Sequence, residues 1–283
     1  MPYQGVHTVA GGQEALRSVA GPLANSIDSV ELLMKSVLAQ EPWEIETSLV
    51  PLPWRSVPAK RDITVGIMHS NGLVKPHPPV QRAMRYAESK LTEAGIKVVT
   101  WESFRHQDAF NLLGTLFFAD GAESHRKVLA ESGEPIHRLT EFVMTGARKL
   151  TFEEYWQSHI DRERLRSEYH QLMKQRGVDC ILCPVTNGVA TRQGNNEYWF
   201  YTGLWNILDQ PALAFPTGLE VDPELDPAEV DYLPLNENDR REHAKYSPEV
   251  FAGMPICLQV VGKHFRDEET VAAARVIESV IKG

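Results

Sequence analysis

Residues 179–184 read Asp-Cys-Ile-Leu-Cys-Pro, a short apolar run directly after a long helical pattern that ends at Gly177. A short apolar run bounded by turn residues is typical of a buried strand. The preceding pattern covers residues 151–176 and carries an apolar stripe at helical spacing: Phe152, Tyr155, Trp156, Leu165, Tyr169, Leu172 and Met173. Glycine commonly follows the last turn of a helix. The stretch therefore predicts a helix followed by a buried strand.

The same alternation extends in both directions along the chain. Strand-like apolar runs occur at 63–68, 96–101, 212–215 and 256–262, and helical patterns at 25–39, 79–94, 108–132, 197–208 and 267–281. Alternation of this kind predicts an α/β fold, with a mixed β-sheet core flanked by helices. In two segments the apolar residues have neither helical nor strand spacing. Residues 42–60 are rich in proline and are expected as a packed connector, and residues 220–247 as an acidic surface excursion.

Charge and composition exclude several classes of protein. The 283 residues carry 29 Lys and Arg against 38 Asp and Glu, a formal net charge of −9. Broad electrostatic attraction to nucleic acid is not expected from this balance. No apolar run is long enough to predict a membrane span, and residues 1–7 lack the pattern of a secretory signal. We therefore expect a cytoplasmic protein without nucleic-acid partners.

The cysteines, histidines and serines give no clear catalytic or metal-binding pattern. Cys180 and Cys183 match a C-x-x-C spacing, but residues three apart on a strand point to opposite faces, so packing is the favoured interpretation. The ten histidines have no ligand spacing. No nucleophile-elbow, phosphate-loop or zinc-protease motif occurs, and no base lies beside Ser18, Ser26 or Ser70 in the sequence. We predict no metal site and no cofactor.

An aromatic segment stands out between residues 197 and 212. Five of the eight residues from Tyr198 to Trp205 are aromatic, more than the core-facing stripe of one helix needs. Two interpretations are open: a helix buried on all sides, or the wall of a substrate cavity.

Four blocks, taken in order, resemble the amidase signature family. Residues 21–28 (GPLANSID), 179–186 (DCILCPVT), 198–216 and 254–262 (MPICLQVVG) are similar to the family's G-P-[ML]-A, D-x-[IL]-[IL]-x-P, Y-T-x-x-[WY]-N-x-x-D-x-P-A and P-[IV]-x-[LV]-Q-x-V-G stretches. The connector and residues 1–14 resemble the branch of fungal acetamidases and fatty-acid amide hydrolases. Each block alone is unspecific, whereas the ordered set is specific.

The resemblance implies a hydrolase that cleaves linear carboxamides through an acyl-enzyme. The family uses a serine nucleophile, a second serine, a lysine base and a Gly/Ser-rich oxyanion loop. No G-G-S-[IS]-R-x-P run occurs in this chain, and the family places it upstream of the position matching Met1. We therefore assign no catalytic residue. Residues 1–283 are expected to be the C-terminal part of a single amidase domain, truncated and inactive alone. The alternative is a non-catalytic remnant that binds a ligand or partner.

The resemblance also implies substrate-binding residues. The family lines its acyl channel before an F-x-D-G turn and around a Y-T dipeptide, which assigns Phe117, Phe118, Trp199, Tyr201 and Gly203 to the substrate site. The bulk of Trp199 would shorten the channel and favour a small or aromatic acyl group. The partner implied is a small-molecule amide, and a homodimer is compatible with the family. A chain of this extent is further expected to expose strand edges and apolar faces.

Overall fold

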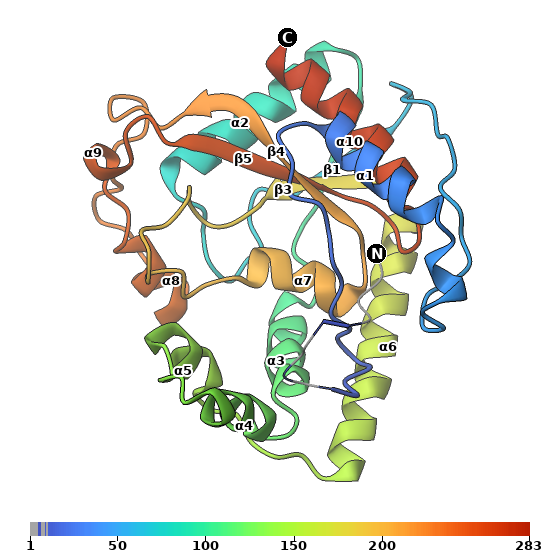
Figure 1. The fold of residues 1–283 in the computed structure, drawn as a ribbon. Coiled ribbons are helices and arrows are strands. Elements are labelled where there is room, and N and C mark those ends of the chain that lie inside the picture. The colour runs from blue at the N-terminus through green and yellow to red at the C-terminus, as the bar shows by residue number, and fades with distance from the viewer. Residues whose placement is uncertain (1–4, 7–8, 10) are drawn as a thin grey trace.

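The core of the structure is a five-stranded mixed β-sheet (Figure 1). The computed structural model describes residues 5–6, 9 and 11–283. The strands lie in the order β2-β1-β3-β5-β4, with bounds Thr64–Ile67 (β1), Lys97–Thr100 (β2), Cys180–Pro184 (β3), Ala212–Glu220 (β4) and Pro255–Val261 (β5). β1 pairs in parallel with β2 and β3, whereas β5 is antiparallel to β3 and β4. This mixed sheet confirms the predicted fold class.

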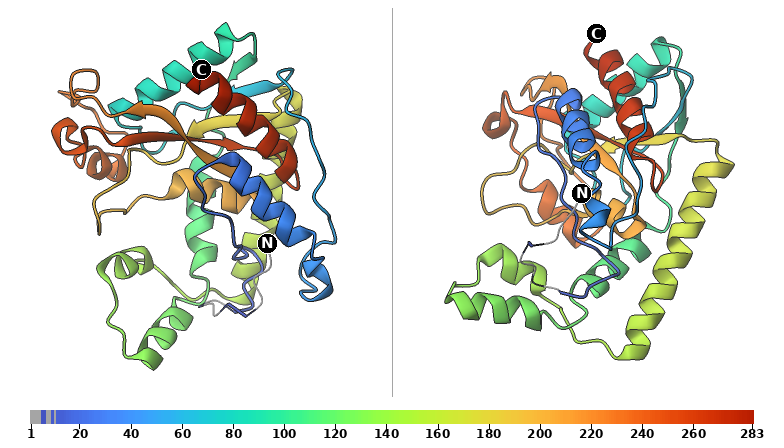
Figure 2. Two further views of the ribbon diagram at one scale, coloured as in Figure 1. Left: turned by 45° about the horizontal axis from the view of Figure 1, so that its top comes forward. Right: turned by 45° about the vertical axis from the view of Figure 1, so that its right-hand side comes forward.

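Helices cover both faces of the sheet (Figures 1 and 2). One apolar cluster joins the sheet to α1 (Ile27–Leu38), α2 (Pro78–Glu93) and α10 (Asp267–Lys282). A second cluster joins the opposite face to α3 (His106–Phe117), α6 (Phe152–Gln175) and α7 (Phe200–Leu208). The aromatic segment therefore lies on the face opposite α10, between α3 and α6.

Strand β3 lies at the centre of the sheet and is buried throughout. Its side chains alternate between the two faces, as the pleat requires. Cys180 and Leu182 belong to the cluster beneath α2 and α10, while Ile181 and Cys183 belong to the cluster beneath α3, α6 and α7. The predicted buried strand and the opposed cysteines are both confirmed.

In the N-terminal third, helix α1 and the extended connector form as expected, but most connector residues are exposed rather than packed. Helix α1 begins after Ser26, whose hydroxyl accepts a hydrogen bond from the Ser29 amide at 3.1 Å. The proline-rich connector holds a short 3₁₀ turn, Pro42–Glu44, and then runs extended along the molecule. Ion pairs of Arg55 with Glu268 and Glu269 fasten it to the start of α10.

The helix expected over 108–132 is instead two helices. α3 ends at Phe117, and α4 (Glu123–Ser132) starts after a turn in which Gly121 and Ala122 have φ of 72° and 62°. The Asp120 carboxylate accepts hydrogen bonds from the amides of Ala122 and Ser124, which stabilises this turn. A further short helix, α5 (Arg138–Met144), follows. Together α4 and α5 project from the body of the molecule (Figure 2).

The acidic segment 220–247 is more structured than a surface excursion. It contains helix α8 (Glu237–His243) and is followed by α9 (Pro248–Phe251). Its carboxylates Asp226 and Asp239 are fully buried. Arg82 pairs with Asp226 through two bonds of 2.7 Å, and Asp239 accepts from the Lys75 amide and the Tyr232 hydroxyl. Buried acids of this kind fasten the segment to the loop after β1 and to α2.

Candidate functional site

Helices α3 and α7 bring three of the expected substrate residues together. The rings of Phe117 and Trp199 lie 5.7 Å apart between centroids. A Cβ added at Gly203 would lie 2.9 Å from the Trp199 ring and 2.6 Å from Leu113, so a larger residue would displace the tryptophan. Phe117 is 42% exposed. We call Phe117, Trp199 and Gly203 the aromatic wall.

Phe118 contacts the wall from its buried side, with its ring centroid 5.1 Å from that of Phe117, whereas Tyr201 points away from the wall. Phe118 is buried in a separate small cluster with Ala122 and Met144. Tyr201 points toward the loop after β1, where its hydroxyl donates to the Val74 carbonyl at 2.6 Å and accepts from the Asn71 amide at 3.3 Å. Burial raises its pKa, so the phenol stays protonated and serves as a structural donor.

The two interpretations of the aromatic segment each hold for part of it. Tyr198, Phe200, Tyr201 and Trp205 are buried, as in a helix packed on all sides. Trp199 is half-buried and faces Phe117. Of the five aromatic residues, Trp199 is therefore the one that belongs to the wall.

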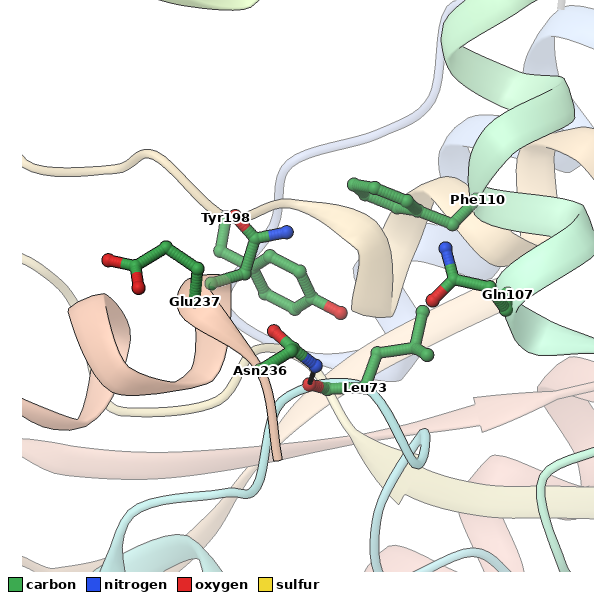
Figure 3. Close-up of a pocket in the computed structure, with 7 residues that line it drawn as sticks. Leu73, Gln107, Phe110, Tyr198, Asn236 and Glu237 are labelled. Atoms are coloured by element: carbon green, nitrogen blue, oxygen red, sulfur yellow. Dashed lines mark hydrogen bonds between the residues drawn. The ribbon is translucent and has the colours of Figure 1, made fainter. Parts of the chain in front are cut away.

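A pocket beside the wall is lined by Tyr198 of the aromatic segment and by six residues that the sequence did not single out. Its volume is about 200 Å³, and Figure 3 shows that it lies between the loop after β1, α3 and the start of α8. Seven residues line it: Leu73, Gln107, Phe110, Tyr198, Asn236, Glu237 and Asn238. The side chain of Asn236 accepts a hydrogen bond from the Asp239 amide and caps α8. This N-cap pattern at residues 236–239 could have revealed α8 from the sequence. No local pattern places α8 beside α3.

Two buried histidines are neutral and already have partners. Burial lowers the pKa of both His77 and His106 to about 4. His106 donates to the Asn71 carbonyl at 2.9 Å, and His77 donates to the Glu242 carbonyl at 3.0 Å. Because the donating nitrogens face backbone carbonyls, these histidines hold loops in place.

The cysteines and serines have structural surroundings. Burial raises the pKa of Cys180 to about 12, and that of Cys183 is raised as well, so neither thiol is activated. The Ser70 hydroxyl accepts from the Gly72 amide in the loop after β1. Within the part of the chain that the structure describes, no group of three or more His, Cys, Asp or Glu residues could hold a metal ion. Nor does any helix of that part have the length and apolar character to cross a membrane.

The architecture is that of the amidase signature fold. A solved fatty acid amide hydrolase matches all of the chain with a TM-score of 0.96 and 34% identity, although the chain covers 51% of that protein. The Amidase family model matches residues 1–271. The chain therefore belongs to the amidase family.

Curated relatives support the assignment. A Schizosaccharomyces pombe protein with a provisional amidase name is 36% identical over 98% of this chain and 52% of its own length. The acetamidase of Aspergillus oryzae is 29% identical over 99% of this chain and 54% of its own length. The chain thus spans about half the length of the curated relatives it matches.

Proposed function

We propose that this chain supplies the substrate-binding wall of an amidase that hydrolyses linear carboxamides through an acyl-enzyme. The observation that carries the proposal is the aromatic wall, in which Trp199 meets Phe117 at 5.7 Å on an amidase fold. The wall presents a half-exposed apolar surface next to a pocket with amide-bearing side chains. Such a combination suits a small organic amide.

The acyl group of the substrate is proposed to be small or aromatic. Trp199 fills the space over Gly203, because a Cβ at that glycine would already meet the tryptophan ring at 2.9 Å. A long acyl chain would have to displace the ring, whereas a flat or short group can stack on it. Phe118, whose ring centroid lies 5.1 Å from that of Phe117, supports the wall from its buried side.

Residues 1–283 are proposed to bind amides without hydrolysing them. The sequence holds no G-G-S-[IS]-R-x-P run, and Ser26 and Ser70 act as backbone hydrogen-bond acceptors. Acyl transfer needs an activated nucleophile beside a base. The alternative function, ligand or partner binding with no amidase partner at all, uses the same wall. The cytoplasmic location stays a prediction, which microscopy of the tagged protein would test.

A serine-reactive fluorophosphonate tests the absence of a nucleophile. The 283-residue chain is incubated with the probe and its intact mass is measured, with a complete fatty acid amide hydrolase as the positive control. We expect the control to gain the probe mass and the chain to stay unmodified. Labelling of a serine in this chain would overturn the proposal.

The acyl-size preference is tested by Trp199→Ala. Removing the indole opens the wall, so affinity for aliphatic amides should rise about fourfold for each further methylene buried, from butyramide to octanamide. Trp156→Ala, on the exposed side of α6 (64% exposed), is the matched control and should leave the affinity for each amide of the series unchanged. Equal affinities across the series in Trp199→Ala would contradict the proposed role. Calorimetric titration gives the values.

A further inference from the structure

The pocket of about 200 Å³ is separate from the aromatic wall. Helix α3 contributes to both, but Gln107 and Phe110 line the pocket, whereas Phe117 belongs to the wall. Figure 3 shows the hydroxyl end of Tyr198 pointing across the pocket toward Gln107 and Leu73. The volume is below the roughly 300–1,000 Å³ of pockets for drug-sized ligands. It therefore suits a small molecule.

Tyr198 keeps one unused hydrogen-bond donor at this pocket. The side-chain oxygen of Asn71 accepts from the amides of Leu73 and Val74, both at 3.0 Å. The Asn71 side-chain nitrogen must therefore face Tyr198, and it donates to the hydroxyl at 2.8 Å. Among the described residues, no acceptor is paired with the hydroxyl proton of Tyr198. Its side chain is 4% exposed, and burial raises its pKa, so the proton remains. A buried donor left unpaired is costly.

The rest of the lining selects for charge and shape. Phe110 and Tyr198 present rings inclined by 30° at a centroid distance of 6.4 Å, which offers apolar faces to a planar group. Gln107, Asn236 and Asn238 contribute neutral amides. Glu237 is the only charged residue of the seven, and it pairs with Arg240 at 2.7 Å. A ligand that carries a carboxylate or phosphate would meet no cation among these lining residues. It would also lie near the Glu237 carboxylate, which has the same sign of charge.

We propose that this pocket binds a small, planar, uncharged carboxamide whose carbonyl accepts the free hydrogen bond of Tyr198. The site prefers the amide to the corresponding carboxylic acid, because the acid is ionised at neutral pH and its charge is unpaired there. The inference rests on the proposed function for the choice of ligand class alone. It requires no hydrolysis.

Titration of the isotope-labelled 283-residue chain by NMR tests the site. Benzamide is compared with benzoate, which is anionic, and with benzamidinium, which is planar but cannot accept a hydrogen bond. We expect benzamide to shift the amide signals of Leu73, Gln107 and Asn236, and to bind at least about tenfold more tightly than benzoate. Shifts confined to other regions, or equal binding of amide and acid, would overturn the proposal.

The variant Tyr198→Phe removes the donor and keeps the ring. It should weaken benzamide by about 3- to 10-fold and leave benzamidinium within twofold. Tyr86→Phe, which removes from α2 a hydroxyl bonded to the Ile281 carbonyl of α10, is the matched control and should leave the affinity for both ligands unchanged. An equal loss for both ligands in Tyr198→Phe would show a merely structural role and contradict the proposal.

A charge variant keeps the test decisive if Tyr198→Phe does not fold. Gln107 is exposed on α3, so Gln107→Arg is expected to be tolerated. The added cation should reverse the preference, so that benzoate binds more tightly than benzamide. An unchanged preference would argue against ligand binding in this pocket. These outcomes are independent of fluorophosphonate labelling, which tests the proposed function.

Discussion

At the scale of single residues, Gly203 sets the position of the aromatic wall. A Cβ at this position would lie 2.6 Å from Leu113 and 2.9 Å from Trp199, closer than packed atoms approach. We expect Gly203→Ala to lower the free energy of unfolding by about 1–3 kcal/mol through overpacking. Urea denaturation followed by fluorescence measures the change.

Gly114→Ala provides the matched control for that substitution. Gly114 lies within α3, and an added Cβ would meet nothing within 4 Å. Alanine should there stabilise the helix by about 0.5–1 kcal/mol. If Gly203→Ala were as stable as the unmodified chain, the tight contact between α7 and α3 would be refuted.

The buried histidines predict a fall in stability at mildly acidic pH. The pKa of His77 and His106 is about 4 when folded and 6.5 ordinarily. Between these values the unfolded chain binds protons that the folded chain does not, so stability is retained above pH 6.5 and declines as the pH falls toward 4. Each histidine contributes on the order of 3 kcal/mol to this decline.

Urea denaturation at pH 7.5, 6.0 and 5.0 measures that decline above the range in which most carboxylates titrate. His106→Gln should flatten the dependence, whereas His170→Gln, on the exposed side of α6, should not. A free energy of unfolding that stays constant from pH 7.5 to pH 5.0 in the unmodified chain would show that the two histidines are not buried as described.

Local residue patterns predicted much at this scale. Ser26 caps α1, and the alternation of strand β3 separates Cys180 from Cys183 as expected. The placement of Phe118 behind Phe117, and of Tyr201 toward the loop after β1, could not be read locally. It depends on the turn at Gly121 and on the loop that accepts the Tyr201 hydrogen bond.

At the scale of elements, Glu197 ties the projecting helix α5 to the body of the protein. Arg138 donates to its carboxylate at 2.6 Å, and Arg241 and Lys245 lie at 3.3 and 3.1 Å. The hydrogen bond from Arg138, and then that from Lys245, lowers the pKa of Glu197. Arg241 also stacks over Phe142 of α5 at 5.0 Å. These contacts bridge α5, the start of α7 and α8.

Glu197→Gln should therefore release α5. We expect faster amide hydrogen exchange across residues 138–144, with unchanged exchange in β3, because the charged contacts are lost while the central sheet stays intact. Glu237→Gln removes an exposed carboxylate of α8 that is paired with Arg240 and should alter neither region. Unchanged exchange in residues 138–144 of Glu197→Gln would show that α5 is held by other contacts.

The periodicity of the sequence predicted each strand of the sheet and the helices that cover it: α1, α2, α3, α6, α7 and α10. The division of residues 108–132 into α3 and α4 was missed, because it depends on a left-handed turn at Gly121 and Ala122 that the Asp120 side chain stabilises. Helical propensity alone does not reveal such a turn. Similarly, the buried pairing of Asp226 with Arg82 is a contact distant in sequence.

At the scale of the whole molecule, strand order and the meeting of α3 with α8 arise from long-range packing. The pocket draws its residues from four regions separated by more than thirty positions. No pattern within one region signals the other three. The family resemblance supplied the aromatic wall, whereas the pocket required the three-dimensional structure.

An exposed apolar surface on α6 predicts self-association. Phe152, Trp156 and Ile160 are 80%, 64% and 54% exposed at spacings of four residues, on one side of the helix. Such a surface favours contact with another molecule. We expect the chain to self-associate at micromolar concentration, and the double variant Phe152→Ser with Trp156→Gln to sediment as a 31.9 kDa monomer.

The matched control for this double variant is Val230→Ser, which removes an isolated apolar side chain that is 86% exposed. It should leave association unchanged. Sedimentation velocity of the three proteins distinguishes the outcomes and also tests whether the self-associated species is a homodimer. A monomeric unmodified chain would contradict the predicted self-association.

The most direct test of the central claim is saturation-transfer NMR of benzamide with the 283-residue chain, followed over a day at neutral pH. The claim is that the chain binds small carboxamides and does not hydrolyse them. The account predicts saturation transfer from the protein to the benzamide ring protons, with no benzoate signal appearing. Absence of transfer would contradict amide binding, and benzoate formed at a rate above the protein-free control would contradict the absence of catalysis.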